Sequence, residues 1–340
     1  MSVPQRVVVR GPNWLGDLVM AAPAIRAMAD TWRETAIHVA VPAAFAPVVP
    51  LLHPRVLGLG LEGRGTRAVT HHAAQLRAGN FDVGLLLTNS FATALALKMA
   101  GVPERWGYAR DGRSWLLTRA IRPRTVHRQS THHADYYAAL VEAVGLPRPQ
   151  LEVQAVLPQS VQTDAVALLR EGGWDGRTPL LACAPGAAYG TAKQWPPSHV
   201  ARVVDGWTSD GGVVALVGAP SDKGATSHVL SMVTPAGEGR GVVIDLTGRT
   251  SLVTLAGVLR AATRVLANDS GAMHLAAALG TPTVTVFGPT REESTAPLGP
   301  HRILTNEVWC RPCMLRECPL NHRCMTGVAP DAVLAALRSR

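Results

Sequence analysis

The chain has 340 residues and a formal net charge of +9, with 47% hydrophobic and 17% charged residues. Its length allows two domains, and its composition is that of a globular protein with ample core, which excludes a disordered chain. No apolar run reaches the length of a membrane span and the N-terminus has no signal-peptide organisation, so we expect a cytosolic protein whose membrane contact is peripheral.

Short apolar segments alternate with helical segments in the first half of the chain. They predict strands near 7–9, 37–41 and 83–87, and helices near 18–29, 67–78, 91–100 and 133–144. Gly145, with Pro147 beyond it, is a stop signal for the last of these helices. Strands that alternate with helices form parallel sheets, so the expected fold class is α/β.

The first predicted strand leads into a loop with the sequence RGPNWLGD at 10–17. Ligands of open α/β sheets bind beyond the carboxyl ends of the strands, so this loop is a candidate binding loop. Gly11 and Gly16 let the backbone come close to a substrate, and Asp17 stands at the start of the next helix. Asp17 is either a helix cap or a general base that removes a proton from an attacking hydroxyl.

Positive charge is concentrated in the first half, because residues 1–150 carry +8 and residues 151–340 carry +1. Seven arginines between 105 and 128 are opposed in that stretch only by Asp111; they are Arg105, Arg110, Arg113, Arg119, Arg122, Arg124 and Arg128. Such a field predicts a polyanionic partner: nucleic acid, an anionic membrane surface or a phosphorylated substrate. A high-GC codon bias would also supply solvated arginines, but it does not explain the asymmetry between the halves.

A segment rich in Pro, Gly and Gln, 147–179, marks the candidate domain boundary. Beyond it, apolar runs predict strands near 180–184, 213–217, 242–245, 265–267 and 283–287, and a last helix over 330–338. We expect two similar α/β halves that face a cleft. The expected division is a first domain at 1–150, a linker region at 151–179, a second domain at 180–329 and a C-terminal helix at 330–340.

The loop at 184–196 is the equivalent, in the second half, of the loop at 10–17. It contains Gly186, Thr191 and Lys193, and Lys193 is one of only three lysines in an arginine-rich chain. A lysine in such a chain favours a compact ammonium placed against a phosphate over a plain surface lysine. Two further strand-end loops predict the nucleotide side of a site, with the ribose near Ser221 and Asp222 and the base near Thr250, Ser251 and Leu252.

The most informative stretch is NDSGAMH at 268–274, which follows an apolar strand and opens an alanine-rich helix. A helix N-terminus in this position presents unpaired N–H groups to an anion, which suits the phosphates of a nucleotide at Ser270 and Gly271. Asp269 accepts hydrogen bonds from sugar hydroxyls, so a nucleotide-sugar is the ligand that needs both features. The alternative is that Asp269 or Ser270 only caps the helix.

Neither half contains the G-x-G-x-x-G dinucleotide fingerprint or the P-loop pattern, which argues against an ordinary dehydrogenase and a nucleoside triphosphatase. Near the end, Cys310, Cys313, Cys318 and Cys324 place four thiols in fifteen residues, with His322 among them. Their spacing matches no familiar zinc ribbon, so structural zinc and reduced thiols are both open, with no catalytic role in either case. Cys183 lies in a predicted strand and is expected in the core.

Taken together, these segments resemble the ADP-heptose:lipopolysaccharide heptosyltransferases of glycosyltransferase family 9 over nearly the whole chain, and most of all the heptosyltransferase II branch. The resemblance rests on the opening loop at 10–17, Gly107-Tyr108, 113–117, the loop at 185–196, the stretch at 268–271 with His274, Gly288-Pro289-Thr290 and the Cys-rich tail. The Gly-Pro-x-Trp-x-Gly-Asp opening and the Ala-Lys-x-Trp-Pro loop point to the branch.

This resemblance implies a GT-B fold of two Rossmann-like domains, the first binding the acceptor and the second ADP-L-glycero-D-manno-heptose. It implies inverting, metal-independent transfer without a cofactor. Asp17 matches the family's proposed base, Lys193 its phosphate-binding lysine and Asp269 its heptose contact, while His274 matches a motif position. The anionic Kdo/heptose-lipid A acceptor, at the cytoplasmic face of the inner membrane, would meet Asn13, Trp14, Arg110 and Arg113 in the positive half.

Several alternatives remain at this point. The chain is also compatible with heptosyltransferase I or another family 9 enzyme, and with a nucleotide-sugar 2-epimerase, which needs no acceptor. A basic nucleic-acid-binding protein with a zinc module would explain the charge and the cysteines. It would leave the paired strand-end loops without a purpose, so we expect no nucleic-acid partner.

Overall fold

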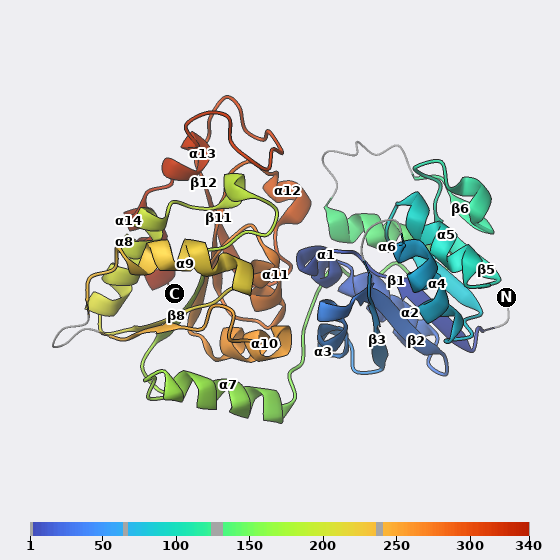
Figure 1. Cartoon of the computed structure of the whole chain (residues 1–340), viewed down its shortest axis with the longest axis horizontal. Helices are drawn as coiled ribbons and strands as arrows, with labels where there is room; N and C mark the ends of the chain where they lie inside the picture. The colour runs from blue at the N-terminus through green and yellow to red at the C-terminus, as the bar shows by residue number, and fades with distance from the viewer. Residues whose placement is uncertain (1–2, 64–66, 124–131, 236–240, 340) are drawn as a thin grey trace. The chain divides into compact units, whose positions relative to one another are not determined.

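The computed structural model describes residues 3–63, 67–123, 132–235 and 241–339, and it divides into two compact units, Met1–Val156 and Leu157–Arg340. Each unit contains one six-stranded sheet (Figure 1). Neighbouring strands are parallel in both sheets. The α/β fold class expected from the sequence is therefore confirmed.

In unit 1 the strand order is β3-β2-β1-β4-β5-β6. The strands are β1 (Arg6–Arg10), β2 (Ala36–Pro42), β3 (Val56–Leu61), β4 (Val83–Leu86), β5 (Glu104–Tyr108) and β6 (Arg119–Ile121). The helices are α1 (Leu15–Met20), α2 (Ala22–Thr31), η1 (Ala43–Val48), α3 (Val49–Leu52), α4 (Ala68–Arg77), α5 (Phe91–Met99), η2 (Ser114–Leu116) and α6 (His133–Ala143).

In unit 2 the strand order is β12-β11-β10-β7-β8-β9. The strands are β7 (Leu180–Ala184), β8 (Val213–Leu216), β9 (Val243–Asp245), β10 (Arg264–Asn268), β11 (Thr283–Phe287) and β12 (His301–Thr305). The helices are α7 (Gln159–Glu171), η3 (Thr191–Lys193), α8 (Pro197–Ser209), η4 (Pro220–Asp222), α9 (Lys223–Leu230), α10 (Leu252–Ala261), α11 (Gly271–Ala278), α12 (Glu292–Thr295), α13 (Arg323–Thr326) and α14 (Pro330–Arg338).

The two sheets have the same topology, since each places its first strand between its second and its fourth. β1 pairs with β2 and β4, and β7 pairs with β8 and β10. Chain direction across the sheet reverses at these points, and ligands of doubly wound folds bind there, beyond the carboxyl ends of the strands. The loops after β1, β7 and β10 stand at these points, and they are the loops that the sequence singles out.

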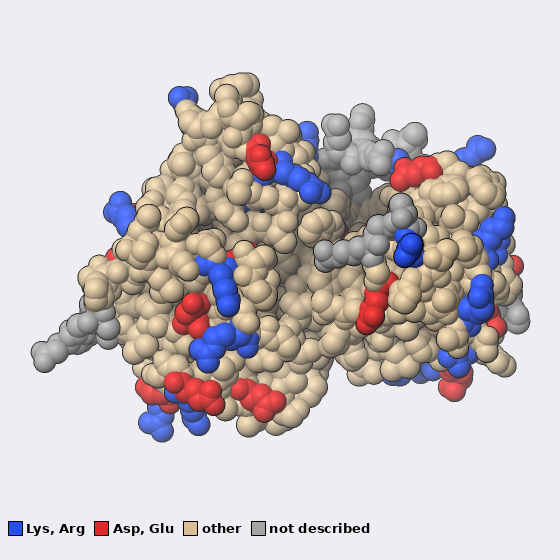
Figure 2. All heavy atoms as spheres, in the orientation of Figure 1, with Lys and Arg blue, Asp and Glu red and all other residues tan. Residues whose placement is uncertain are grey.

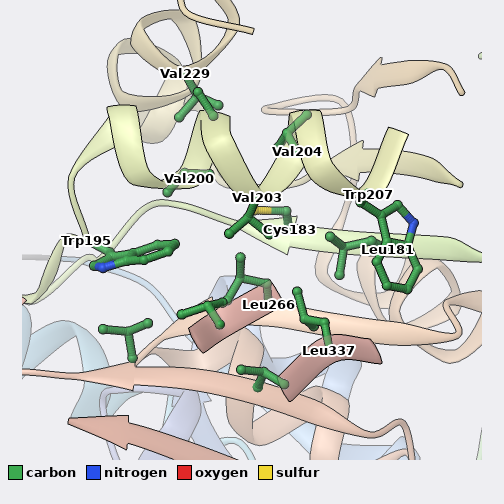
Figure 3. Packing of buried hydrophobic residues seen from close by; sticks show 14 of the residues in the cluster. Leu181, Cys183, Trp195, Val200, Val203, Val204, Trp207, Val229, Leu266 and Leu337 are labelled. Carbon is green, nitrogen blue, oxygen red and sulfur yellow. The ribbon is translucent and has the colours of Figure 1, made fainter. Parts of the chain in front are cut away.

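The central strands are buried and mostly apolar because helices cover both faces of a parallel sheet. Every residue of β4, β7, β8 and β11 is buried. In unit 2 the core continues under α8, where Cys183 and Trp195 lie against Val200 and Val203 (Figure 3). The expectation that Cys183 is a core residue is confirmed, and the burial of Trp195 fixes the end of the loop that carries Lys193.

Several elements differ from the sequence-based expectation. The helix expected over 18–29 is two helices, α1 and α2, which meet at Ala21. Four strands were not expected: β3, β5, β6 and β12. The segment 151–179, expected as a linker region, contains α7, which packs on α10. No helix within the described ranges is long and apolar enough to cross a membrane.

Candidate active site

In unit 1, Asp17 lies in the first turn of α1 and does not cap that helix. The N-cap of α1 is Trp14, which forms no side-chain cap hydrogen bond. Instead, Asp17 Oδ1 accepts from Nδ1 of His133, the first residue of α6, at 2.8 Å. The Asp17 side chain is 22% exposed and that of His133 is 46% exposed, so solvent reaches the pair. The Asp17 carboxylate thus has the contacts of a general base that is oriented by a hydrogen bond from a neighbouring side chain, His133.

A buried phenol flanks this carboxylate. Burial raises the pKa of Tyr137 well above its ordinary value, and the negative charge of Asp17 raises it further. Tyr137 is only 7% exposed and stays neutral at physiological pH. Asp17 is therefore bordered by the partly exposed imidazole of His133 and by a buried phenol that stays neutral.

Arg10 shapes the loop between β1 and α1. Its guanidinium donates to the carbonyl oxygens of Gly11 and Ala40, and to Oδ1 of Asn13 at 2.6 Å. Burial lowers the pKa of Arg10 to about 10, so it remains charged at neutral pH. Asn13 is held in place by this contact, whereas the Trp14 side chain beside it is 45% exposed. Both residues expected at the acceptor thus lie at the carboxyl end of β1, and Trp14 is open to a ligand.

The two arginines expected at the acceptor occupy different environments. Arg110 is half-buried, whereas Arg113 is 0% exposed. The Arg113 guanidinium donates to the carbonyl oxygens of Tyr108 at 3.1 Å and Thr88 at 2.5 Å, which ties the end of β5 to the end of β4. The acceptor contact expected of Arg113 is corrected accordingly: a fully buried guanidinium that bonds to backbone carbonyls serves the fold.

Two other members of the arginine-rich stretch also bond to backbone. Arg105 donates to the carbonyl oxygens of Leu116 and Val102, and Arg119 donates to that of Val144. Arg124 and Arg128 lie outside the described residues. On the face shown in Figure 2, Lys and Arg side chains of unit 1 occupy separate positions and form no continuous patch. Three arginines of this stretch, Arg105, Arg113 and Arg119, are therefore held by contacts with backbone carbonyl oxygens.

In unit 2, Lys193 and Asp269 form an ion pair that is largely buried. Lys193 Nζ lies 2.5 Å from Asp269 Oδ2, and the two side chains are 11% and 5% exposed. The same carboxylate oxygen accepts from Thr290 Oγ1 at 2.6 Å. Lys193 ends η3, Asp269 follows β10 and Thr290 follows β11, so three strand-end loops meet at one carboxylate. Asp269 is engaged in this contact and is not a helix cap.

Asn268 closes the loop that carries Lys193. Its Nδ2 donates to the carbonyl oxygen of Pro185 at 2.7 Å, and its Oδ1 accepts from the backbone N–H of Trp195 at 3.1 Å. Pro185 and Trp195 are the two ends of the loop, so one buried amide fixes both. Its 3% exposure means that losing either contact would leave a polar group unsatisfied.

The N-terminus of α11 lies beside this ion pair. Ser270 is the N-cap in extended geometry and makes no side-chain cap hydrogen bond. Its Oγ is buried and has no hydrogen-bond partner among the described residues, so the Ser270 side chain does not cap the helix, in contrast to the alternative interpretation. The leading N–H groups of α11, from Gly271 on, are the groups that a helix presents to an anion. His274 is 3% exposed within α11.

The loops expected at the ribose and base follow β8 and β9 and touch one another, since Gly248 N–H donates to the Gly218 carbonyl oxygen at 2.9 Å. Asp222 accepts from the backbone N–H of Ala219 at 2.8 Å. Gly186 lies so close that an added Cβ would be 2.3 Å from Asp222 Cγ. The Ser251 hydroxyl caps α10 by accepting from the Thr254 N–H at 3.0 Å, so it is engaged within its helix.

The other residues expected at the nucleotide are also at this edge of the sheet. Ser221 lies within η4 and is exposed, and Thr191 begins η3 and is exposed. Thr250 and Leu252 flank Ser251 and are half-buried. Gly186, Thr191, Ser221, Thr250 and Leu252 thus all follow the carboxyl ends of β7, β8 and β9, where the sequence placed them.

The Cys-rich segment packs against the loop that carries Lys193. Cys310, Cys313, Cys318 and Cys324 are free thiols beside a cavity of about 420 Å³. In the described part of the chain, no three His, Cys, Asp or Glu side chains are placed to hold a metal ion, so the zinc alternative has no donor set there. His322 Nε2 instead lies 2.6 Å from the carbonyl oxygen of Ala192.

Sequence reasoning did not anticipate His133, Thr290 or Asn268 as site residues. The first two reach the site across long chain separations: His133 is 116 residues from Asp17 and Thr290 is 21 from Asp269. Asn268 was part of the motif, and its place at the end of a buried strand is the signal that could have identified it. A buried amide there must satisfy its bonding capacity on neighbouring loops.

Comparison with known proteins gives a consistent result. The family model described as glycosyltransferase family 9 (heptosyltransferase) matches residues 69–323. The lipopolysaccharide heptosyltransferase 2 of Escherichia coli (strain K12) is 29% identical over 305 residues, covering 86% of this chain and 85% of that protein. The lipooligosaccharide heptosyltransferase 2 of Haemophilus ducreyi is 25% identical over 349 residues and covers 98% of each chain.

The structure of Escherichia coli ADP-heptose lipopolysaccharide heptosyltransferase II is similar over the whole chain. The TM-score is 0.81 with 27% sequence identity, and the match covers 98% of this chain and 97% of that one. Two parallel six-stranded sheets that match this structure are the GT-B fold expected from the sequence.

Proposed function

The chain belongs to glycosyltransferase family 9 (heptosyltransferase), and from this premise we propose that it is a heptosyltransferase II. It transfers heptose from ADP-L-glycero-D-manno-heptose to the inner core of lipopolysaccharide. The relatives named heptosyltransferase 2 support this branch because they match over most of both chains. The observation that carries the proposal is that each sheet has a charged side chain in the loop at its switch point, the Asp17 carboxylate after β1 in unit 1 and the Lys193 ammonium after β7 in unit 2.

The proposed reaction is a single displacement at C1 of the heptose. An acceptor hydroxyl gives its proton to the Asp17 carboxylate, and its oxygen forms a bond to C1. The bond between C1 and the β-phosphate oxygen breaks, and ADP leaves with the electron pair. One displacement from the opposite face inverts the configuration at C1.

The leaving diphosphate gains negative charge, which the protein stabilises with groups already in place. Lys193 supplies an ammonium, and α11 supplies its leading N–H groups. Asp269 exchanges its contact with Lys193 for the heptose hydroxyls when the donor binds. These groups act without a metal ion in the proposed mechanism.

On the acceptor side, Asn13, Trp14 and Arg110 are the proposed contacts, since Arg113 is buried. The phosphates and acidic sugars of the Kdo/heptose-lipid A acceptor need a guanidinium that is accessible, and Arg110 is half-buried next to the end of β5. An acceptor in the cytoplasmic leaflet of the inner membrane would bring the enzyme to that surface as a peripheral protein. The KM for the acceptor in an R110Q variant is the readout for this role.

The experiment that tests the proposal measures ADP release from ADP-L-glycero-D-manno-heptose in the presence of a chelator. One acceptor ends in Kdo and the other carries a first heptose. We expect release only with the heptose-bearing acceptor, inverted product, and a kcat about 10²- to 10⁴-fold lower in a folded D17N variant. Release with the Kdo-ended acceptor would make the enzyme a heptosyltransferase I, and nucleotide release without an acceptor would point to an epimerase.

A further inference from the structure

In the structure, the proposed donor site has little net positive charge. Lys193 is neutralised by Asp269 at 2.5 Å, and that carboxylate also holds Thr290. The diphosphate of a nucleoside diphosphate sugar carries two negative charges, and the ADP that leaves carries a third. When Asp269 releases Lys193 to the donor, Lys193 supplies one positive charge and the N-terminus of α11 about half of one, so a further cation near Lys193 would strengthen binding of the diphosphate.

Arg316, in the Cys-rich segment, lies in that position. Its guanidinium carbon is 5.2 Å from the centre of the Tyr189 ring, and Lys193 Nζ is 4.7 Å from the same centre. Because both distances run to one ring, the two charges lie within about 10 Å of each other, the range over which charges interact at 0.1 M salt. The Arg316 side chain is exposed, and among the residues that the structure describes it forms no ion pair.

The backbone holds Arg316 against the Lys193 loop. The Arg316 carbonyl oxygen accepts from the Ala192 N–H at 2.9 Å, and the Tyr189 hydroxyl donates to the Met314 carbonyl oxygen at 2.8 Å. An added Cβ on Gly190 would lie 2.3 Å from the Arg316 carbonyl oxygen, so the two segments are in close contact there. The Met314 N–H donates to the Pro289 carbonyl oxygen at 2.8 Å, which ties the segment to the loop with Thr290.

On the basis of the proposed function, we propose that Arg316 is a second diphosphate-binding cation, mounted on Tyr189 beside Lys193. A guanidinium donates two parallel N–H bonds to phosphate oxygens and keeps its charge at every physiological pH, and an aromatic face orients it. In this proposal the Cys-rich segment, 310–324, positions Arg316 beside the donor diphosphate, and this role requires no metal. The ligand class is the diphosphate of a nucleoside diphosphate or its sugar ester.

The test measures nucleotide binding by displacement of a fluorescent ADP analogue, without acceptor or sugar. We expect R316Q to weaken ADP about tenfold, the effect of losing one charge-assisted contact, and to leave adenosine unchanged. R316K should restore part of the affinity because it keeps the charge without the planar fork. Y189L, which removes the ring, should behave like R316Q. The matched control is R202Q on α8, whose arginine is 66% exposed and pairs with Asp331 at 3.4 Å.

Equal losses for ADP and adenosine in R316Q would assign Arg316 a structural role, and an unchanged ADP affinity would exclude a phosphate contact; either result overturns the proposal. In the transferase assay R316Q should raise the KM for the donor about tenfold with a smaller change in kcat. A wild-type protein that binds no ADP would instead contradict the proposed function, before any variant is compared.

Discussion

At the scale of single residues, the contact between Asp17 and His133 sets the state of the proposed base. His133 Nδ1 must donate to the carboxylate at 2.8 Å, so Oδ1 is engaged and the other carboxylate oxygen is left for the acceptor hydroxyl. The sequence gives no sign of this contact, because the two residues lie 116 positions apart and only the packing of α6 near α1 brings them together.

We expect H133A to lower kcat about tenfold, the value of one hydrogen bond to a charged group, with the KM for ADP-heptose unchanged. H133N places an amide N–H near the position of Nδ1 and should recover most of the activity. It should also remove from the pH profile of kcat any component due to the imidazole. Steady-state kinetics between pH 5.5 and 8.5 checks both variants, and an H133A enzyme with wild-type kcat would remove His133 from the mechanism.

The burial and the hydrogen-bond partners of the arginines at 105–128 could not be predicted from the sequence. The sequence reports how many arginines stand at 105–128, but it does not report that Arg113 is fully buried or that Arg105 bonds to backbone carbonyls. The places of Asp17, Lys193 and Asp269 in strand-end loops were predictable because each loop follows a buried strand, whereas their roles stay predictions. Arg113 follows β5, a strand that the sequence did not predict, so its surroundings were not predictable either.

At the scale of elements, apolar runs predicted the strands that are buried on both faces. Among the described strands they missed three of the four at sheet edges, β3, β6 and β12, and also β5, which is the neighbour of β6. β3 has the pattern VLGLGL, in which Gly58 and Gly60 allow close approach of η1: an added Cβ on Gly58 would lie 2.0 Å from the Ala46 carbonyl oxygen. β6 is three residues long and forms the edge of its sheet. Strands that are held mainly by backbone hydrogen bonds, or by close contact of glycines with a neighbouring segment, have only a weak hydrophobic pattern in the sequence.

The packing of the Cys-rich segment on the Lys193 loop can be tested by adding one methyl group. We expect G190A to weaken ADP binding about tenfold, because its Cβ would displace the Arg316 carbonyl oxygen, 2.3 Å away, and break the bond to Ala192. The matched control is G224A in α9, where an added Cβ meets nothing within 4 Å. That variant should bind ADP normally and gain up to ~1 kcal/mol of stability. ADP titration and thermal melts give both readouts, and wild-type ADP affinity in a folded G190A would contradict the coupling.

At the scale of the whole molecule, partly buried histidines make stability depend on pH. Burial lowers the pKa of four of them below the ordinary value of 6.5: His38, His53, His72 and His199. Below pH 6.5 the unfolded chain therefore binds more protons than the folded one, and the free energy of unfolding falls as the pH falls. Well above pH 6.5 both states hold neutral histidines, and this contribution to stability is complete.

We expect the melting temperature to be level from pH 8 to 7 and to decrease as the pH falls from 6.5 towards 5. Thermal melts followed by circular dichroism in buffers of constant ionic strength measure this. A melting temperature that rises on acidification through this window would contradict the direction of the four shifts. Losses that begin only below pH 4.5 would instead reflect carboxylates such as Glu104, whose pKa is lowered first by its hydrogen bond from Trp106.

The division into two α/β halves was predictable because the alternation of strands and helices restarts after the Pro- and Gly-rich segment. The identical strand order of the two sheets was not, since it depends on pairings between strands distant in sequence. It has a practical consequence for redesign. The two units have the same strand order but different loops. The loops proposed to select the acceptor and those proposed to select the donor are therefore encoded in separate stretches of the gene. Exchanging the loops of residues 157–340 for those of a relative should change the choice of sugar donor, while the preference for the acceptor is inherited unchanged from residues 1–156.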